Sequence, residues 1–144
     1  MNYLLDTVVI SELRKSQPSR QVVRWIKAQK ADHLFISVVS VGEIERGIEK
    51  MRKADPAFAS ELVQWLEALL TLYAEQVLPV SANTARRWGQ LSAKLGHDGA
   101  DLLIAATALT HGLTVVTRNV KHFAPTGVAV FNPFETAASN VRRV

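Results

Sequence analysis

Short apolar runs alternate along the chain with longer segments in which apolar residues recur every three or four positions. Short runs of this kind are typical of strands buried on both faces, and the longer segments are typical of amphipathic helices. Strands that alternate with helices predict a mainly parallel sheet covered on both faces, which is a three-layer α/β/α domain. The expected strands are Tyr3–Leu5, Leu34–Ser37, Val77–Val80, Leu113–Val116 and Val128–Phe131.

Capping residues, prolines and glycines predict where the helices begin and end. A helix is expected to begin near Thr7 and to end before Pro18, which can then open the next helix. Gly112 is placed to end a buried central helix in the left-handed conformation. The other expected helices are one that starts at Ser40, one from Phe58 to Leu72, one with Trp88, Leu91 and Leu95 inward, and the central one from Asp101 to Leu109.

The length and composition favour one globular domain over residues 1–144, with 48% hydrophobic and 21% charged residues. The chain has no cysteine, which excludes a disulfide framework, a zinc–thiolate site and a thiol nucleophile. No apolar run is long enough to span a bilayer, and the start does not have the pattern of a signal peptide. We therefore expect a cytoplasmic protein without a membrane segment. The net charge of +4 tolerates a polyanionic partner but does not require one.

Oxygen-bearing side chains occur where the predicted strands end and where two of the helices begin. Asp6 follows the first strand, and Asn119 follows the strand that ends at Val116. Glu43 and Asp101 each fall in the expected first turn of a helix that would point back to the same edge. Because the carboxyl edge of such a sheet carries functional groups, we expect these four side chains to converge there.

Each acid also has a simpler explanation as a helix cap. Ser40 and Glu43 have the spacing of a capping box, Asp98 can cap the helix that contains Asp101, and Asp6 can cap the helix that follows it. Taken together, the acids favour a metal site, because clustered carboxylates repel one another and a divalent cation removes that cost. Hard oxygen ligands suit Mg²⁺ or Mn²⁺, and such an ion can activate water for attack on a phosphodiester without a protein nucleophile.

Three segments that contain these acids resemble, in order, the motifs of PIN-domain nucleases, and specifically the VapC and FitB-like toxins. LLDTVVISEL (Leu4–Leu13) is similar to the first motif, with Asp6 as its acid. ISVVSVGEIERGIEK (Ile36–Lys50) is similar to the second, with Glu43 as its acid. DLLIAATALTHGLTVVTRNVKHF (Asp101–Phe123) is similar to the third and fourth motifs, with Asp101 as the third acid.

The resemblance implies a PIN fold and a type II toxin that acts as a Mg²⁺- or Mn²⁺-dependent endoribonuclease. It implies that Asp6, Glu43 and Asp101 are catalytic metal ligands, and that Asn119 holds the fourth catalytic position. It also implies inhibition by a cognate antitoxin, contact with operator DNA only through the antitoxin complex, and a homodimer.

Two departures from the family pattern bear on activity. Val8 stands where the first motif often has Asn, and the fourth acidic position has Asn119, with His122 in place of a further acid. A competing hypothesis is therefore a catalytically weakened PIN-like module that acts by binding a partner protein. A receiver-like phosphoacceptor domain is a third hypothesis, but the third strand is followed by Ser81-Ala82-Asn83 and not by the Asp that a receiver needs.

Overall fold

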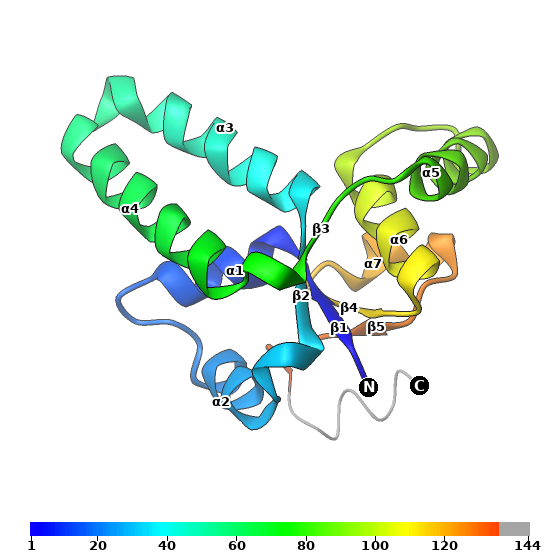
Figure 1. Cartoon of the computed structure of the whole chain (residues 1–144), viewed down its shortest axis with the longest axis horizontal. Coiled ribbons are helices and arrows are strands. Elements are labelled where there is room, and N and C mark those ends of the chain that lie inside the picture. The colour runs from blue at the N-terminus through cyan, green and yellow to red at the C-terminus, as the bar shows by residue number, and fades with distance from the viewer. Residues whose placement is uncertain (136–144) are drawn as a thin grey trace.

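The computed structural model describes residues 1–135, and its centre is a parallel sheet of five strands. The strand order is β3-β2-β1-β4-β5, so β1 lies in the middle with a neighbour on each side. The predicted parallel sheet is confirmed, and residues 136–144 of the predicted domain lie outside the described residues (Figure 1). The strands are β1 (Tyr3–Leu5), β2 (Leu34–Ser37), β3 (Val77–Leu78), β4 (Thr114–Val116) and β5 (Val130–Phe131).

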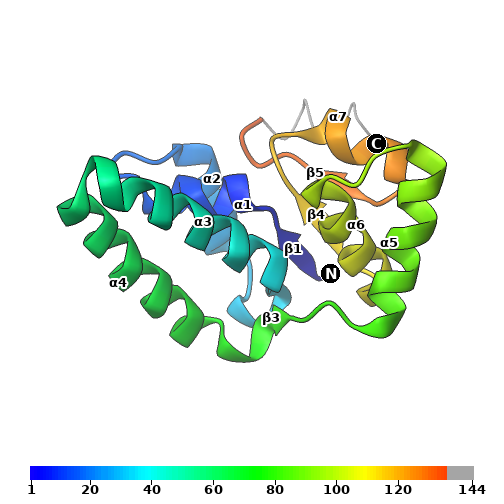
Figure 2. The same ribbon diagram turned by 90° about the horizontal axis from the view of Figure 1, so that it is seen from above.

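Seven α-helices within residues 1–135 cover the sheet in two groups (Figure 2). The first group forms one wing of the molecule, and the second group forms the opposite wing with β4 and β5. The helices of the first wing are α1 (Thr7–Arg14), α2 (Arg20–Ala28), α3 (Val38–Ala54) and α4 (Pro56–Leu72). Those of the second are α5 (Ala82–Leu95), α6 (Ala100–His111) and α7 (Val120–Phe123). Short 3₁₀ turns occupy Ala31–His33, Ala74–Gln76 and Ala124–Thr126.

The sheet separates two hydrophobic cores. Successive residues of a strand point to opposite faces, so Leu5 joins the core under the first group of helices and Leu4 joins the core under the second. Helix α6 has six consecutive or near-consecutive buried residues between Leu102 and Ala108, as its apolar sequence predicts. The helices within residues 1–135 include none with the length and apolarity that a bilayer crossing requires.

Three predicted helix starts are wrong, because each helix begins behind a different residue from the one predicted. Helix α3 begins at Val38, since the Ser37 hydroxyl accepts from the Val39 N–H at 3.0 Å, so Ser40 lies inside the helix and Glu43 falls in its second turn. Helix α2 begins at Arg20 behind a Ser19 cap, not at Pro18. Helix α6 has Gly99 and not Asp98 at its cap position.

The end of helix α6 generates a test of the fold. Gly112 has a φ of 66°, in the left-handed region that costs an L side chain about 1–2 kcal/mol, whereas Gly89 lies inside α5 with open space around its Cα. We expect Gly112→Ala to lower the free energy of unfolding by about 1 kcal/mol, and Gly89→Ala to raise it by up to about 1 kcal/mol. Urea denaturation of the two variants measures both effects. Equal effects of the two substitutions would contradict the assignment of the α6 end.

Candidate active site

Asp6 lies at the carboxyl end of the central strand and is 4% exposed. Its backbone N–H donates to the Val116 carbonyl at 3.0 Å, which continues the pairing of β1 with β4. One carboxyl oxygen, Oδ1, accepts from the Thr7 N–H at 2.8 Å, and the other, Oδ2, accepts from the Thr117 hydroxyl at 2.8 Å. Asp6 is therefore the N-cap of α1, as the capping explanation predicts. It is also held by Thr117, which directly follows β4.

Glu43 reaches the same region from the second turn of α3. Its Oε1 accepts from the Thr7 hydroxyl at 2.6 Å, and the same hydroxyl lies 2.8 Å from the Ser40 hydroxyl. The predicted capping box of Ser40 and Glu43 is wrong, because Ser37 caps α3 and both side chains contact Thr7 instead. Glu43 is thus joined to the end of the central strand.

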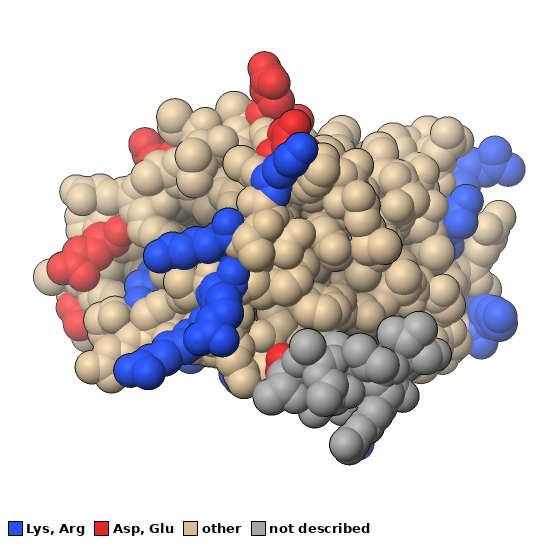
Figure 3. Space-filling view, turned by 90° about the horizontal axis from the view of Figure 1, so that it is seen from below, with Lys and Arg blue, Asp and Glu red and all other residues tan. Residues whose placement is uncertain are grey.

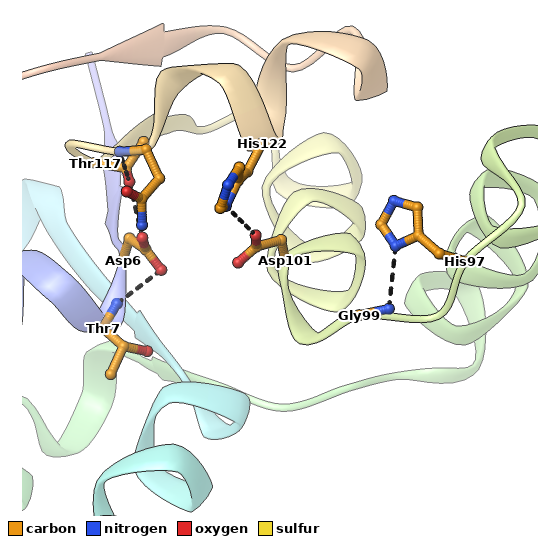
Figure 4. A network of polar contacts seen from close by, with 8 residues as sticks. Asp6, Thr7, His97, Gly99, Asp101, Thr117 and His122 are labelled. Carbon is orange, nitrogen blue, oxygen red and sulfur yellow. Dashed lines mark hydrogen bonds and ion pairs between the residues drawn. The ribbon is translucent and has the colours of Figure 1, made fainter.

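Asp101 approaches from the first turn of α6, as the sequence predicts. In Figure 4 its carboxyl group faces that of Asp6, and His122 of α7 lies above it. The Nδ1 atom of His122 is 3.1 Å from Asp101 Oδ2, and the histidine side chain is 63% exposed. Helix α7 is thereby joined to the start of α6 through a side-chain contact.

Asn119 lies in the turn between β4 and α7. Its backbone N–H donates to the Thr117 hydroxyl at 2.9 Å, so Thr117 is held from one side while it donates to Asp6 from the other. The Asn119 side chain does not cap α7. The assignment of Asn119 to the fourth catalytic position stays a prediction.

The pKa of Asp6 reports how the acids act on one another. Burial raises this pKa from 3.8 to about 6, and the hydrogen bonds from Thr117 and Thr7 oppose the rise. The charges of Asp101 and Glu43 raise the pKa of Asp6 further. Asp6, which directly follows β1, is therefore close enough to Glu43 on α3 and Asp101 on α6 for their charges to act on it.

This donor set fits a divalent cation. Carboxylate oxygens are the ligands that Mg²⁺ and Mn²⁺ prefer, and a buried carboxylate without a cationic partner gains most from such an ion. As they stand, no three Asp, Glu or His side chains of residues 1–135 lie close enough to enclose an ion. Binding would therefore require side chains to move toward Asp6.

The chain as a whole is mildly basic. The whole chain carries a net charge of +4, and Figure 3 shows basic side chains in a group on the left and at the right margin of the face seen from below. On α2, a shallow groove is lined by Pro18, Arg20, Val23, Arg24 and Lys27. A positive exterior attracts polyanions, whereas the acidic site itself repels them unless a cation is present.

The family model described as "PIN domain" matches residues 3–126. The chain belongs to the PIN-domain family. The VapC ribonuclease Y4jK of Sinorhizobium fredii is 37% identical over 141 residues, which cover 93% of this chain and 99% of that protein. The toxin FitB of Neisseria gonorrhoeae is 35% identical over 137 residues, which cover 91% and 97%. A structure of FitAB bound to a DNA fragment aligns with a TM-score of 0.81 and 33% identity, covering 93% of this chain and 96% of that one.

The resemblance of the motifs to VapC and FitB-like PIN domains is therefore confirmed, and the structure explains one of the two departures. Val8 of this PIN domain packs against the core beneath the first group of helices, so an apolar residue suits that position. Sequence reasoning missed the contact of Thr7 with Glu43. The only signal for it was the polar residue that directly follows Asp6.

The raised pKa of Asp6 predicts how the stability of the metal-free PIN domain depends on pH. Because this pKa is higher in the folded than in the unfolded chain, the charged carboxylate costs nothing below pH 3.8. The cost grows as the pH rises and is complete above about 6, where it reaches about 3 kcal/mol.

We therefore expect Asp6→Asn to stabilise the metal-free protein by up to about 3 kcal/mol at neutral pH and to lose this advantage in acid. Urea denaturation at several pH values, in the presence of a chelator, measures the difference. The same substitution at the exposed Asp98 is the control. A gain in the free energy of unfolding of Asp6→Asn that does not vary with pH would contradict the electrostatic explanation.

Proposed function

We propose that this chain is the toxin of a type II toxin–antitoxin pair and a metal-dependent endoribonuclease. Asp6, Glu43 and Asp101 are its metal ligands, and Mg²⁺ or Mn²⁺ is the cation. The observation that carries this proposal is the arrangement of three acids at one end of the sheet. Thr7 contacts both the buried Asp6 and Glu43, and the carboxyl group of Asp101 faces Asp6 (Figure 4). Family membership and the names of the relatives, VapC ribonuclease and toxin FitB, support the reaction.

A divalent cation, when bound, supplies the Lewis acidity for hydrolysis of a phosphodiester. The protein supplies oriented oxygens. Thr117 and the Thr7 N–H hold the plane of the Asp6 carboxylate, and His122 contacts one oxygen of Asp101. Hydrogen-bonded partners of this kind set the direction and basicity of metal ligands. Asn119, beside Thr117, offers a neutral oxygen at the fourth position.

The partners follow from the same family. A related structure contains FitAB bound to a DNA fragment. We propose that a cognate antitoxin binds this chain in the same way, and that operator DNA is contacted only through that complex. RNA is the substrate of the toxin, and the chain forms a homodimer. The toxin–antitoxin pair acts in the cytoplasm.

A second candidate function is a PIN-like module that binds a partner without cleaving RNA. Asn119 favours this candidate, because an amide replaces a carboxylate at the fourth position and removes one negative charge from the site. The two functions differ in whether the purified chain binds Mn²⁺ through Asp6 and whether it cleaves RNA.

Removal of a single ligand charge tests the nuclease. We expect Asp101→Asn to reduce RNA cleavage by more than the roughly 10–100-fold that is typical of losing an outer partner of a metal ligand. Growth arrest on expression should be lost as well, and chelation by EDTA should stop cleavage by the parent protein. Asp98→Asn, three residues earlier and exposed, should retain activity. If Asp101→Asn remains as active and as toxic as the parent, the site assignment is wrong.

A substitution at the fourth catalytic position, Asn119, tests the metal site by a gain of Mn²⁺ binding instead of a loss. Asn119→Asp adds a carboxylate beside Thr117, and we expect Mn²⁺ affinity measured by calorimetry to rise on the order of 10-fold. Asn83→Asp on the exposed start of α5 is the control for added charge. An unchanged affinity of Asn119→Asp would mean that this side chain does not serve the ion, and would favour the binding module.

A further inference from the structure

Thr7 contacts two of the three acids, although it has no charge to place on a metal ion. Its backbone N–H donates to Asp6 Oδ1 at 2.8 Å, and its hydroxyl lies 2.6 Å from Glu43 Oε1. It is the first residue of α1, which packs against α3. Thr7 therefore links a ligand at the end of the central strand to a ligand on a helix thirty-six positions away.

The direction of the hydrogen bonds follows from counting protons. A threonine hydroxyl has one proton and can accept from further donors, whereas an ionised carboxylate can only accept. The proton of Thr7 must then point to Glu43. The contact of 2.8 Å between the two hydroxyl oxygens is in that case a bond donated by Ser40, whose side chain is fully buried. The result is a chain of hydroxyls that runs from Ser40 through Thr7 to Glu43.

Such a chain orients the carboxylate of Glu43. Hydrogen bonds that donate into an ionised group are shorter and stronger than neutral ones, and aligned hydroxyls polarise one another. Because one oxygen of Glu43 is held, the plane of the carboxyl group is restricted and the direction of its other oxygen is restricted with it. Helix α3 then needs little further ordering to present Glu43 to a cation.

We propose that Thr7, supported by Ser40, is the positioning residue that holds Glu43 in place for the divalent cation. This inference rests on the proposed function for the identity of the ion, but the hydroxyl chain can be tested without it. Thr7 is not a ligand in this proposal, and its effect on the cation acts through Glu43.

The first experiment measures Mn²⁺ binding by calorimetry for the parent, Thr7→Val and Thr7→Ser. Valine keeps the shape and the backbone N–H to Asp6 but removes the hydroxyl, whereas serine keeps the hydroxyl. We expect Thr7→Val to weaken Mn²⁺ binding roughly 10-fold or more, and Thr7→Ser to bind within about 3-fold of the parent. Thr110→Val is the matched control, because its hydroxyl bonds to the Ala106 carbonyl within α6.

Two outcomes of that experiment would overturn the proposal. Parent-like binding by Thr7→Val would show that the hydroxyl does not position Glu43. Equal weakening by valine and serine would show that the shape of the side chain matters, not its hydroxyl. Should Thr7→Val fail to fold, Ser40→Ala is the second variant, and we expect it to weaken binding several-fold because it removes the support behind Thr7.

The second experiment separates this inference from the nuclease proposal. A double-mutant cycle of Thr7→Val and Glu43→Ala, followed by urea denaturation with a chelator, reports the contact in the metal-free chain. We expect the shift of the urea midpoint in the double variant to differ from the sum of the single shifts. Additive shifts would overturn the hydroxyl chain even in an active nuclease. A non-additive cycle in a chain that neither binds Mn²⁺ nor cleaves RNA would keep the contact but overturn its role toward a cation.

Discussion

The position of Asp6 at the end of a central strand constrains every other part of the site. Strand β1 has β2 on one side and β4 on the other, so its carboxyl end opens in the middle of the sheet edge and not at a margin. Helix α1 then begins directly at Asp6, which leaves the carboxyl group 4% exposed. A buried charge needs hydrogen-bond donors close at hand, and the two elements nearest to it provide them, α1 through the Thr7 N–H and the end of β4 through Thr117.

The other acids reach Asp6 because of the same topology. Glu43 follows β2, which pairs with β1, so α3 starts beside Asp6. Asp101 lies at the opposite end of its helix from β4, and α6 must start at the carboxyl edge in order to return the chain to the beginning of that parallel strand. Two separate cores hold these helices, one on each face of the sheet. The distance across the site is therefore set by the sheet and not by the acids themselves.

The sequence alone predicts most of this framework. Apolar runs locate all five strands, although Pro79 ends β3 at Leu78 because a proline has no N–H to donate to a neighbouring strand. The acids could be assigned to one edge for the same reason, since carboxyl ends of parallel strands coincide. Helix starts were predicted less well. Several hydroxyl and carboxyl side chains lie near each start. Ser37 and Ser40 are both fully buried, so burial alone does not indicate which of them caps α3.

The contacts of Thr7 and His122 could not be read from the sequence, because they join residues that are adjacent only after the sheet has formed. These contacts also support the acids unequally. Asp6 is held at both oxygens and is buried, Glu43 is held at one oxygen, and the Asp101 side chain is 33% exposed beside a histidine that is more exposed still. Mutual repulsion therefore acts on one fixed and two less restrained carboxylates. Repulsion opposes a closer approach of such groups in the absence of a cation. Within residues 1–135, no three acidic or histidine side chains are close enough to enclose an ion as they stand. A cation at Asp6 would reverse the sign of that interaction, and most of the movement would fall on Asp101, because Thr7 already holds Glu43.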